Sequence, residues 1–280
     1  NKVLKNFDKL TEEEKIETLL SLNFKPSSMT FEDEFITELL ESIRTIGKIQ
    51  EVNGVEGCHR YVISNCKSAL DVIRVYQLAN LILGKNEELS LDIVPLFESI
   101  EDLSNAADVM ASLYSVPAYR EHLKRRGHKQ TIMLGFSDGT KDGGYLRANW
   151  SIFQAKENLT RITRDQGFVA VFFDGRGGPP ARGGGNTHDF YASLGDTIED
   201  KEVQLTIQGQ TISSNFGKVA SCQYNLEQLL SAGIEGKVFG HPLGQLEEND
   251  KKLLDQLAEA GYRAYLDLKL DPKFVPYLEK

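Results

Sequence analysis

The first part of the chain has apolar positions at helical spacing. Thr11 followed by Glu14 is typical of a helix capping box, and the apolar residues behind it are Ile16, Leu19, Leu20 and Leu22. Residues 32–47 repeat the amphipathic pattern and predict a second helix. Both segments predict a helical beginning to the chain.

After residue 57, short apolar runs alternate with longer segments of helical spacing. Five runs predict strands, at residues 60–64, 89–97, 131–136, 168–173 and 203–207. The segments between them predict helices at 70–83, 99–115 and 145–166, and helical spacing returns at 220–232 and 246–280. This alternation predicts parallel strands joined by right-handed crossovers, and so an α/β sheet or barrel. Five strands are too few to close a barrel of eight.

Charged residues follow three consecutive predicted strands. These are Glu98, the pair Ser137-Asp138, and the segment Asp174-Gly175-Arg176. In α/β folds, ligands bind beyond the carboxyl ends of the parallel strands. The three strand ends together therefore predict a functional site.

The two acids at neighbouring strand ends are of the type that holds magnesium. Mg²⁺ is usually bound through one or two carboxylates, and water and substrate supply its other ligands. Each acid also has a local explanation: Glu98 would lie near a helix N-terminus, and Asp138 precedes Gly139 in a turn-like pair. The metal interpretation is favoured because both acids lie at adjacent strand ends.

Residues 174–185 contain two arginines among six glycines, directly after the fourth predicted strand. Glycines let a backbone approach a ligand closely, and Arg176 and Arg182 offer planar donor groups suited to phosphate or carboxylate. The segment predicts a mobile anion-binding loop, although an ordinary surface loop remains an alternative. Lys141, in the segment after Asp138, could neutralise a developing anion or be an ordinary solvated lysine.

Composition restricts the class of protein. A net charge of −9 argues against a nucleic-acid partner, and no apolar run reaches the roughly 18 residues of a membrane span. Three scattered cysteines predict a reducing compartment, the cytoplasm. Because the chain starts at Asn1 without a methionine, we expect a piece of a longer protein.

Several segments resemble signature segments of the phosphoenolpyruvate carboxylase family, in that family's order. They are residues 96–103, residues 135–144, Gly175-Arg176-Gly177-Gly178 and Arg182-Gly183-Gly184-Gly185, with further likeness at residues 61–64, 185–188 and 208–209. The resemblance implies a (β/α)8 barrel with additional helices, of which this chain would hold about five strands. It would form one unit with a helical lead-in at 1–56, a partial barrel with active-site loops at 57–240 and a helical tail at 241–280.

The resemblance also implies an activity. Members of the family join bicarbonate and phosphoenolpyruvate, with Mg²⁺ or Mn²⁺, into oxaloacetate and phosphate. Glu98 and Asp138 match the metal ligands, and Lys141, Arg176, Gly177 and Gly178 match residues around the substrate. Arg182 matches a loop arginine associated with catalysis and with a carboxylate inhibitor.

Two departures from the family pattern stand out. Many members have histidine where this chain has Asp174, and the family's Thr-Ala-His-Pro motif with its catalytic base has no counterpart here. We therefore expect the isolated chain to be inactive, and to self-associate as a homo-oligomer through its open sheet edge. The alternatives are a free-standing metal-dependent lyase acting on another enolate, and a non-catalytic anion-binding or assembly module.

Overall fold

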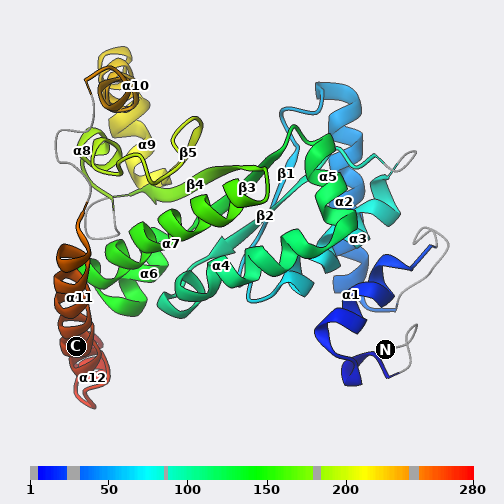
Figure 1. Ribbon diagram of the computed structural model, residues 1–280, viewed down its shortest axis with the longest axis horizontal. Coiled ribbons are helices and arrows are strands. Elements are labelled where there is room, and N and C mark those ends of the chain that lie inside the picture. The colour runs from blue at the N-terminus through cyan, green and yellow to red at the C-terminus, as the bar shows by residue number, and fades with distance from the viewer. Residues whose placement is uncertain (1–5, 24–31, 85–87, 179–183, 240–245) are drawn as a thin grey trace.

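The protein folds around a single parallel sheet. A computed structural model describes residues 6–23, 32–84, 88–178, 184–239 and 246–280. Within them five strands pair in sequence order, β1-β2-β3-β4-β5. The strands are β1 (Arg60–Ile63), β2 (Asp92–Phe97), β3 (Lys129–Leu134), β4 (Val169–Gly177) and β5 (Val203–Ile207). The sheet curves along this order as part of a (β/α)8 barrel, which confirms the predicted fold class (Figure 1).

Helices connect and cover the strands. They are α1 (Glu12–Leu20), α2 (Glu34–Asn53), α3 (Ala69–Leu83), α4 (Ile100–Ser115), α5 (Pro117–Arg125), α6 (Phe136–Gly143), α7 (Tyr145–Asp165), α8 (Thr187–Ala192), α9 (Gly209–Phe216), α10 (Val219–Phe239), α11 (Glu248–Lys269) and α12 (Phe274–Leu278), after a 3₁₀ turn at Phe7–Lys9. Helices α3, α4 and α7 pack against the sheet, α10 packs on α8 and α9, and α11 runs beside α6 and α7 (Figure 1).

Local sequence signals set several helix ends. The Thr11–Glu14 capping box starts α1, and a second box between Ser99 and Asp102 starts α4. Gly167 follows α7 with a φ of 78°, a left-handed conformation that glycine adopts without steric cost. These boundaries agree with the sequence prediction within a residue or two.

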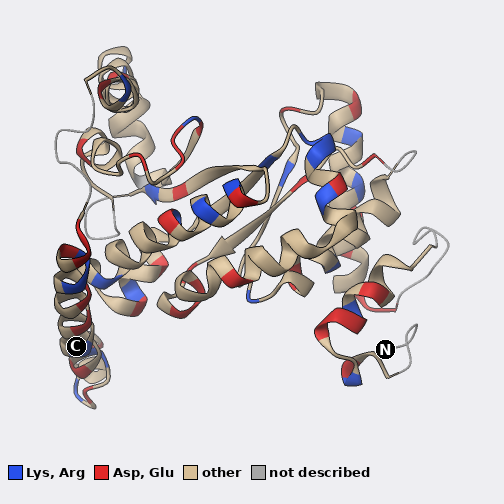
Figure 2. Ribbon diagram, in the orientation of Figure 1, with Lys and Arg blue, Asp and Glu red and all other residues tan. Residues whose placement is uncertain are grey.

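The core lies between the sheet and helices α3, α4 and α7. Its fully buried members include Ile73, Phe97, Leu103, Leu134 and Leu159. Each of these helices contributes buried apolar residues to this core. Charged positions of both signs occur along α7 and α11 (Figure 2). In the described part of the chain, no helix is long and apolar enough to cross a bilayer.

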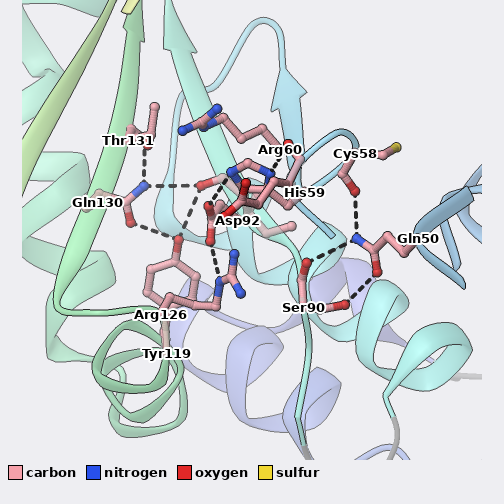
Figure 3. Close-up of polar contacts among 12 residues, drawn as sticks. Gln50, Cys58, His59, Arg60, Ser90, Asp92, Tyr119, Arg126, Gln130 and Thr131 are labelled. Atoms are coloured by element: carbon pink, nitrogen blue, oxygen red, sulfur yellow. Dashed lines mark hydrogen bonds and ion pairs between the residues drawn. The ribbon is translucent and has the colours of Figure 1, made fainter. Parts of the chain in front are cut away.

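A polar network joins the amino ends of the strands (Figure 3). Asp92, the first residue of β2, accepts a hydrogen bond of 2.6 Å from Nε of Arg126. Gln130 at the start of β3 accepts from the Tyr119 hydroxyl at 2.9 Å and donates to the Ile93 carbonyl at 3.1 Å. In barrel folds this edge serves stability, while the opposite edge carries the active site. The candidate site is therefore sought at the carboxyl ends of the strands.

The carboxyl ends of two strands differ from the prediction by two residues or more. Strand β3 stops at Leu134, two residues early, because Phe136 already begins α6. Strand β4 continues to Gly177, four residues beyond the predicted end, because the glycine-containing segment pairs with β5. Asp138 therefore lies on a helix and Arg176 on a strand, where the sequence predicted loops.

Candidate functional site

Strands β2 and β3 end at the same level, and β4 runs three residues beyond it. Phe97 of β2 pairs with Leu134 of β3, and Leu134 pairs with Asp174 of β4. Glu98 directly follows Phe97, and Arg176 lies two residues beyond Asp174 on the same strand. The predicted residues Glu98, Asp138 and Arg176 thus come from three adjacent βα units, at the carboxyl ends of their strands.

Glu98 lies half-buried beyond the end of β2. One of its carboxylate oxygens accepts a hydrogen bond of 3.3 Å from the backbone N–H of Asn65. Burial raises the pKa of Glu98 above its ordinary value, and the Asp138 carboxyl raises this pKa further. The two acids are therefore close enough to repel each other, and a cation between them would relieve that repulsion.

Helix α6 brings Asp138 to this position by means of a glycine-lined face. Gly135, Gly139 and Gly143 are spaced four residues apart, and so share one side of the helix. A Cβ on Gly135 would lie 3.1 Å from the Cα of Glu98, and one on Gly143 would lie 2.6 Å from Ile100. Larger side chains would push α6 away from Glu98.

Lys141 follows Asp138 by one helical turn on α6. Its ammonium lies 2.8 Å from Asp138 Oδ1, and both side chains are exposed. The Lys141 carbonyl accepts hydrogen bonds from the Tyr265 hydroxyl at 2.7 Å and from Lys269 Nζ at 3.0 Å. Helix α11 thus holds the end of α6, and a cation stands beside one of the two acids.

Arg176 is the buried cation of the site. Its side chain points into the protein from β4 and only 6% of its surface is exposed. The guanidinium carbon lies 4.0 Å from the centre of the Phe190 ring. Among the described residues, its Nε has no hydrogen-bond partner. Burial lowers the pKa of Arg176, and the nearby Asp174 counteracts this effect.

The glycines after Arg176 allow close backbone contacts. A Cβ on Gly177 would overlap the carbonyl oxygen of Thr206, and one on Gly178 would lie 2.5 Å from Oε1 of Gln208. The Thr211 hydroxyl donates to the Gly177 carbonyl at 2.6 Å. A cavity of about 60 Å³, enough for water, lies here and is lined by residues that include Arg176, Gly177, Gly178, Gly185 and Thr187.

Two site-adjacent residues were not found by sequence reasoning. Lys156 and Tyr191 are buried against Asp174, at 2.7 Å and 2.8 Å from its Oδ2. One signal for Lys156 was present, because it lies four residues after Ile152 on the core-facing side of α7. Arg182, also predicted for the site, lies outside the described residues.

The donor set at Glu98 and Asp138 suits a hard divalent cation. Both side chains offer carboxylate oxygens, the ligands that Mg²⁺ and Mn²⁺ prefer. In the portion of the chain that the structure describes, no group of three or more His, Cys, Asp or Glu residues could hold a metal. A pair of carboxylates fits magnesium, because that ion keeps several waters when it binds to protein.

Comparisons with a family model and with known proteins identify the same family. The family model described as "Phosphoenolpyruvate carboxylase" matches residues 1–280. The chain is 35% identical over 243 residues to the phosphoenolpyruvate carboxylase of Chromobacterium violaceum, covering 85% of this chain and 27% of the relative. It is 34% identical over 235 residues to that of Mycobacterium leprae, covering 82% of this chain and 25% of the relative.

The chain thus spans about a quarter of the length of these relatives. The family match extends over the whole chain and includes the strand ends that carry Glu98, Asp138 and Arg176. This chain belongs to the phosphoenolpyruvate carboxylase family.

Proposed function

We propose that this chain supplies the metal-binding and phosphoryl-binding part of a phosphoenolpyruvate carboxylase active site. The reaction joins bicarbonate to phosphoenolpyruvate and yields oxaloacetate and phosphate. The observation that carries the proposal is the placement of Glu98 and Asp138 after the adjacent strands β2 and β3, beside the next strand, which carries the buried Arg176. An acid pair beside a cation suits a substrate that carries a phosphoryl group and becomes an enolate.

Glu98 and Asp138 would hold Mg²⁺ or Mn²⁺ through their carboxylates. When bound, the ion supplies positive charge that stabilises the enolate oxygen. Lys141 would then exchange its contact with Asp138 for contact with the substrate, because an exposed ion pair of this kind contributes little to stability. This exchange would place a mobile cation beside the charge that develops during the reaction.

Arg176 would bind the phosphoryl oxygens. Its planar donors suit phosphate geometry, and its attraction for an anion is strengthened by low solvent exposure. Gly177 and Gly178 would leave room for the phosphoryl group next to the backbone. We assign catalysis and carboxylate-inhibitor binding to Arg182 on the family resemblance alone.

The proposal places half of a site on these 280 residues. No Thr-Ala-His-Pro segment, which in the family carries the catalytic base, occurs in them. We therefore expect the 280-residue chain alone to show no carboxylation, and we retain homo-oligomer formation as a prediction. All three cysteines are free, in keeping with a reducing compartment such as the cytoplasm.

The test measures oxaloacetate formation by the full-length protein, with and without Mg²⁺, through coupled oxidation of NADH. Arg176→Ala is expected to raise KM for phosphoenolpyruvate by about tenfold or more, because a charged hydrogen-bonding group is lost. Arg263→Ala is the matched control, since this exposed arginine of α11 pairs only with Glu259 among the described residues. Turnover that needs no divalent ion, or an unchanged KM in Arg176→Ala, would overturn the proposal.

A further inference from the structure

Helix α7 carries a lysine in the interior of the protein. Only 1% of Lys156 is exposed, and Asp174, its partner on β4, is completely buried. The ammonium lies 2.7 Å from Oδ2 of Asp174. A buried ion pair of this kind contributes little net stability, because desolvation offsets the attraction. Its presence next to a functional strand end therefore calls for another explanation.

A tyrosine completes the cluster. The hydroxyl of Tyr191 on α8 donates to the same oxygen of Asp174, Oδ2, at 2.8 Å. The second oxygen, Oδ1, is also buried, and it has no hydrogen-bond partner within the described residues. Both hydrogen bonds thus go to one oxygen of the carboxylate, and the other oxygen can accept a further one.

Arg176 lies on the same face of β4 as Asp174. Asp174 and Arg176 are two residues apart on β4, so their side chains point to the same face, and both are buried. Lys156 Nζ lies 5.3 Å from the centre of the Phe190 ring, and the Arg176 guanidinium carbon lies 4.0 Å from it. Asp174 therefore has two cations within its surroundings, but it bonds to only one of them.

The charge balance of the cluster affects how Arg176 can bind an anion. Lys156 and Asp174 neutralise each other, so among the described residues no carboxylate forms an ion pair with Arg176. A carboxylate that lacked its lysine would be drawn to the guanidinium, because arginine–carboxylate pairs are among the strongest hydrogen-bonded contacts in proteins. That pairing would occupy the donors that an anionic ligand needs.

We propose that Lys156 is a positioning residue for Arg176, which holds Asp174 away from the guanidinium and so keeps it free for an anion. Tyr191 supports the same orientation of Asp174. The inference rests on the proposed role of Arg176 in binding the phosphoryl group. It also gives Asp174, where many family members have histidine, a role of its own, since the acid would balance the charge of Lys156 beside Arg176.

The experiment is calorimetric titration of the full-length protein with phosphoenolpyruvate, which does not depend on turnover. Lys156→Gln is expected to weaken binding by about tenfold or more, because Asp174 would then pair with Arg176. The double variant with Lys156→Gln and Asp174→Asn is expected to bind within about threefold of the native protein, since the competing charge is removed. This rescue separates positioning from simple loss of packing.

The outcomes distinguish the positioning role of Lys156 from the proposed phosphoryl-binding role of Arg176. Native affinity in Lys156→Gln, or equal weakening in the single and the folded double variant, would overturn the inference. Native affinity in Arg176→Ala would instead overturn the proposed function. If circular dichroism shows that Lys156→Gln does not fold, the double variant and Tyr191→Phe replace it. Tyr191→Phe is then expected to weaken binding less than tenfold and to be rescued by Asp174→Asn, and absence of that rescue would contradict the inference.

Discussion

The guanidinium carbon of Arg176 lies 4.0 Å from the centre of the Phe190 ring. Phe190 belongs to α8, so this contact ties the helix after the glycine-rich segment to the end of β4. The face of an aromatic ring attracts a cation without using its hydrogen-bond donors. Phe190 can therefore hold Arg176 in place while the guanidinium nitrogens remain free.

Replacing Phe190 with leucine is expected to weaken phosphoenolpyruvate binding by about three- to tenfold, because the cation–π contact is lost while apolar volume is kept. Calorimetry on the full-length protein measures this directly. Phe153→Leu is the matched control, since Phe153 stacks on Trp150 on α7. It is expected to lower the melting temperature without changing affinity, and a loss of affinity in both variants would contradict the role of Phe190.

Glu98→Gln is expected to stabilise the metal-free protein at pH 7. The pKa of Glu98 is raised by burial and by Asp138, so folding disfavours its ionised form. This penalty is absent below the ordinary glutamate pKa of about 4.5, where Glu98 is protonated in both states, and it develops as pH rises through the raised pKa. Thermal melts at pH 4 and pH 7 check the sign. A native protein that is more stable than Glu98→Gln at pH 7 would contradict this account of Glu98.

Stability is expected to fall between pH 6.5 and about pH 4 because of His122. Only 1% of this residue is exposed, and burial lowers its pKa from 6.5 to about 4. The unfolded chain binds the proton first, so the stabilisation present above pH 6.5 is lost on acidification, up to ~3 kcal/mol. Urea unfolding as a function of pH measures the slope.

His122→Phe should flatten this pH dependence, because it removes the titratable imidazole. Phenylalanine suits the position, since Tyr76 and Tyr119 surround it with aromatic rings. The control is His128→Asn at an exposed position, where φ is 59° and asparagine is tolerated. An equal pH dependence in the native protein and His122→Phe would exclude His122 as its source.

Gly177→Ala is expected to disrupt the β4–β5 pairing, because its Cβ would overlap the carbonyl of Thr206. Overpacking of this kind typically costs ~1–3 kcal/mol or more. Gly233→Ala on α10 has open space around the new Cβ and should instead be neutral or stabilising. Melting temperatures of the two variants compare them, and a Gly177→Ala protein as stable as the native one would contradict the described register.

The sequence predicted the strands and the main helices because their signals are local. Short β-branched and aromatic runs marked β1 to β5, and the Thr11 and Ser99 capping boxes marked α1 and α4. The ends of β3 and β4 were misplaced for a physical reason. Glycine is intrinsically unfavourable in helices and strands, so the glycines of α6 and of the end of β4 indicated loops, whereas close packing against Glu98 and Thr206 requires them there.

The candidate site was predictable only where its residues follow strands. Glu98 and Arg176 occur at strand ends in the sequence, and Asp138 lies close to one. The Lys156–Asp174–Tyr191 cluster was not predicted, because its members come from α7, β4 and α8 and meet only through tertiary packing. The single signal in the sequence was a lysine on an apolar helix face, and this pattern does not indicate which residue the lysine pairs with.

The measurement that tests the account most directly is Mn²⁺ binding to the full-length protein, detected by electron paramagnetic resonance. Glu98→Gln and Asp138→Asn are each expected to weaken binding by about tenfold or more, as loss of a ligand should. Glu101→Gln, an exposed acid in the first turn of α4, is expected to bind as the native protein does. Native Mn²⁺ affinity in both Glu98→Gln and Asp138→Asn would contradict the assignment of this acid pair as the metal site.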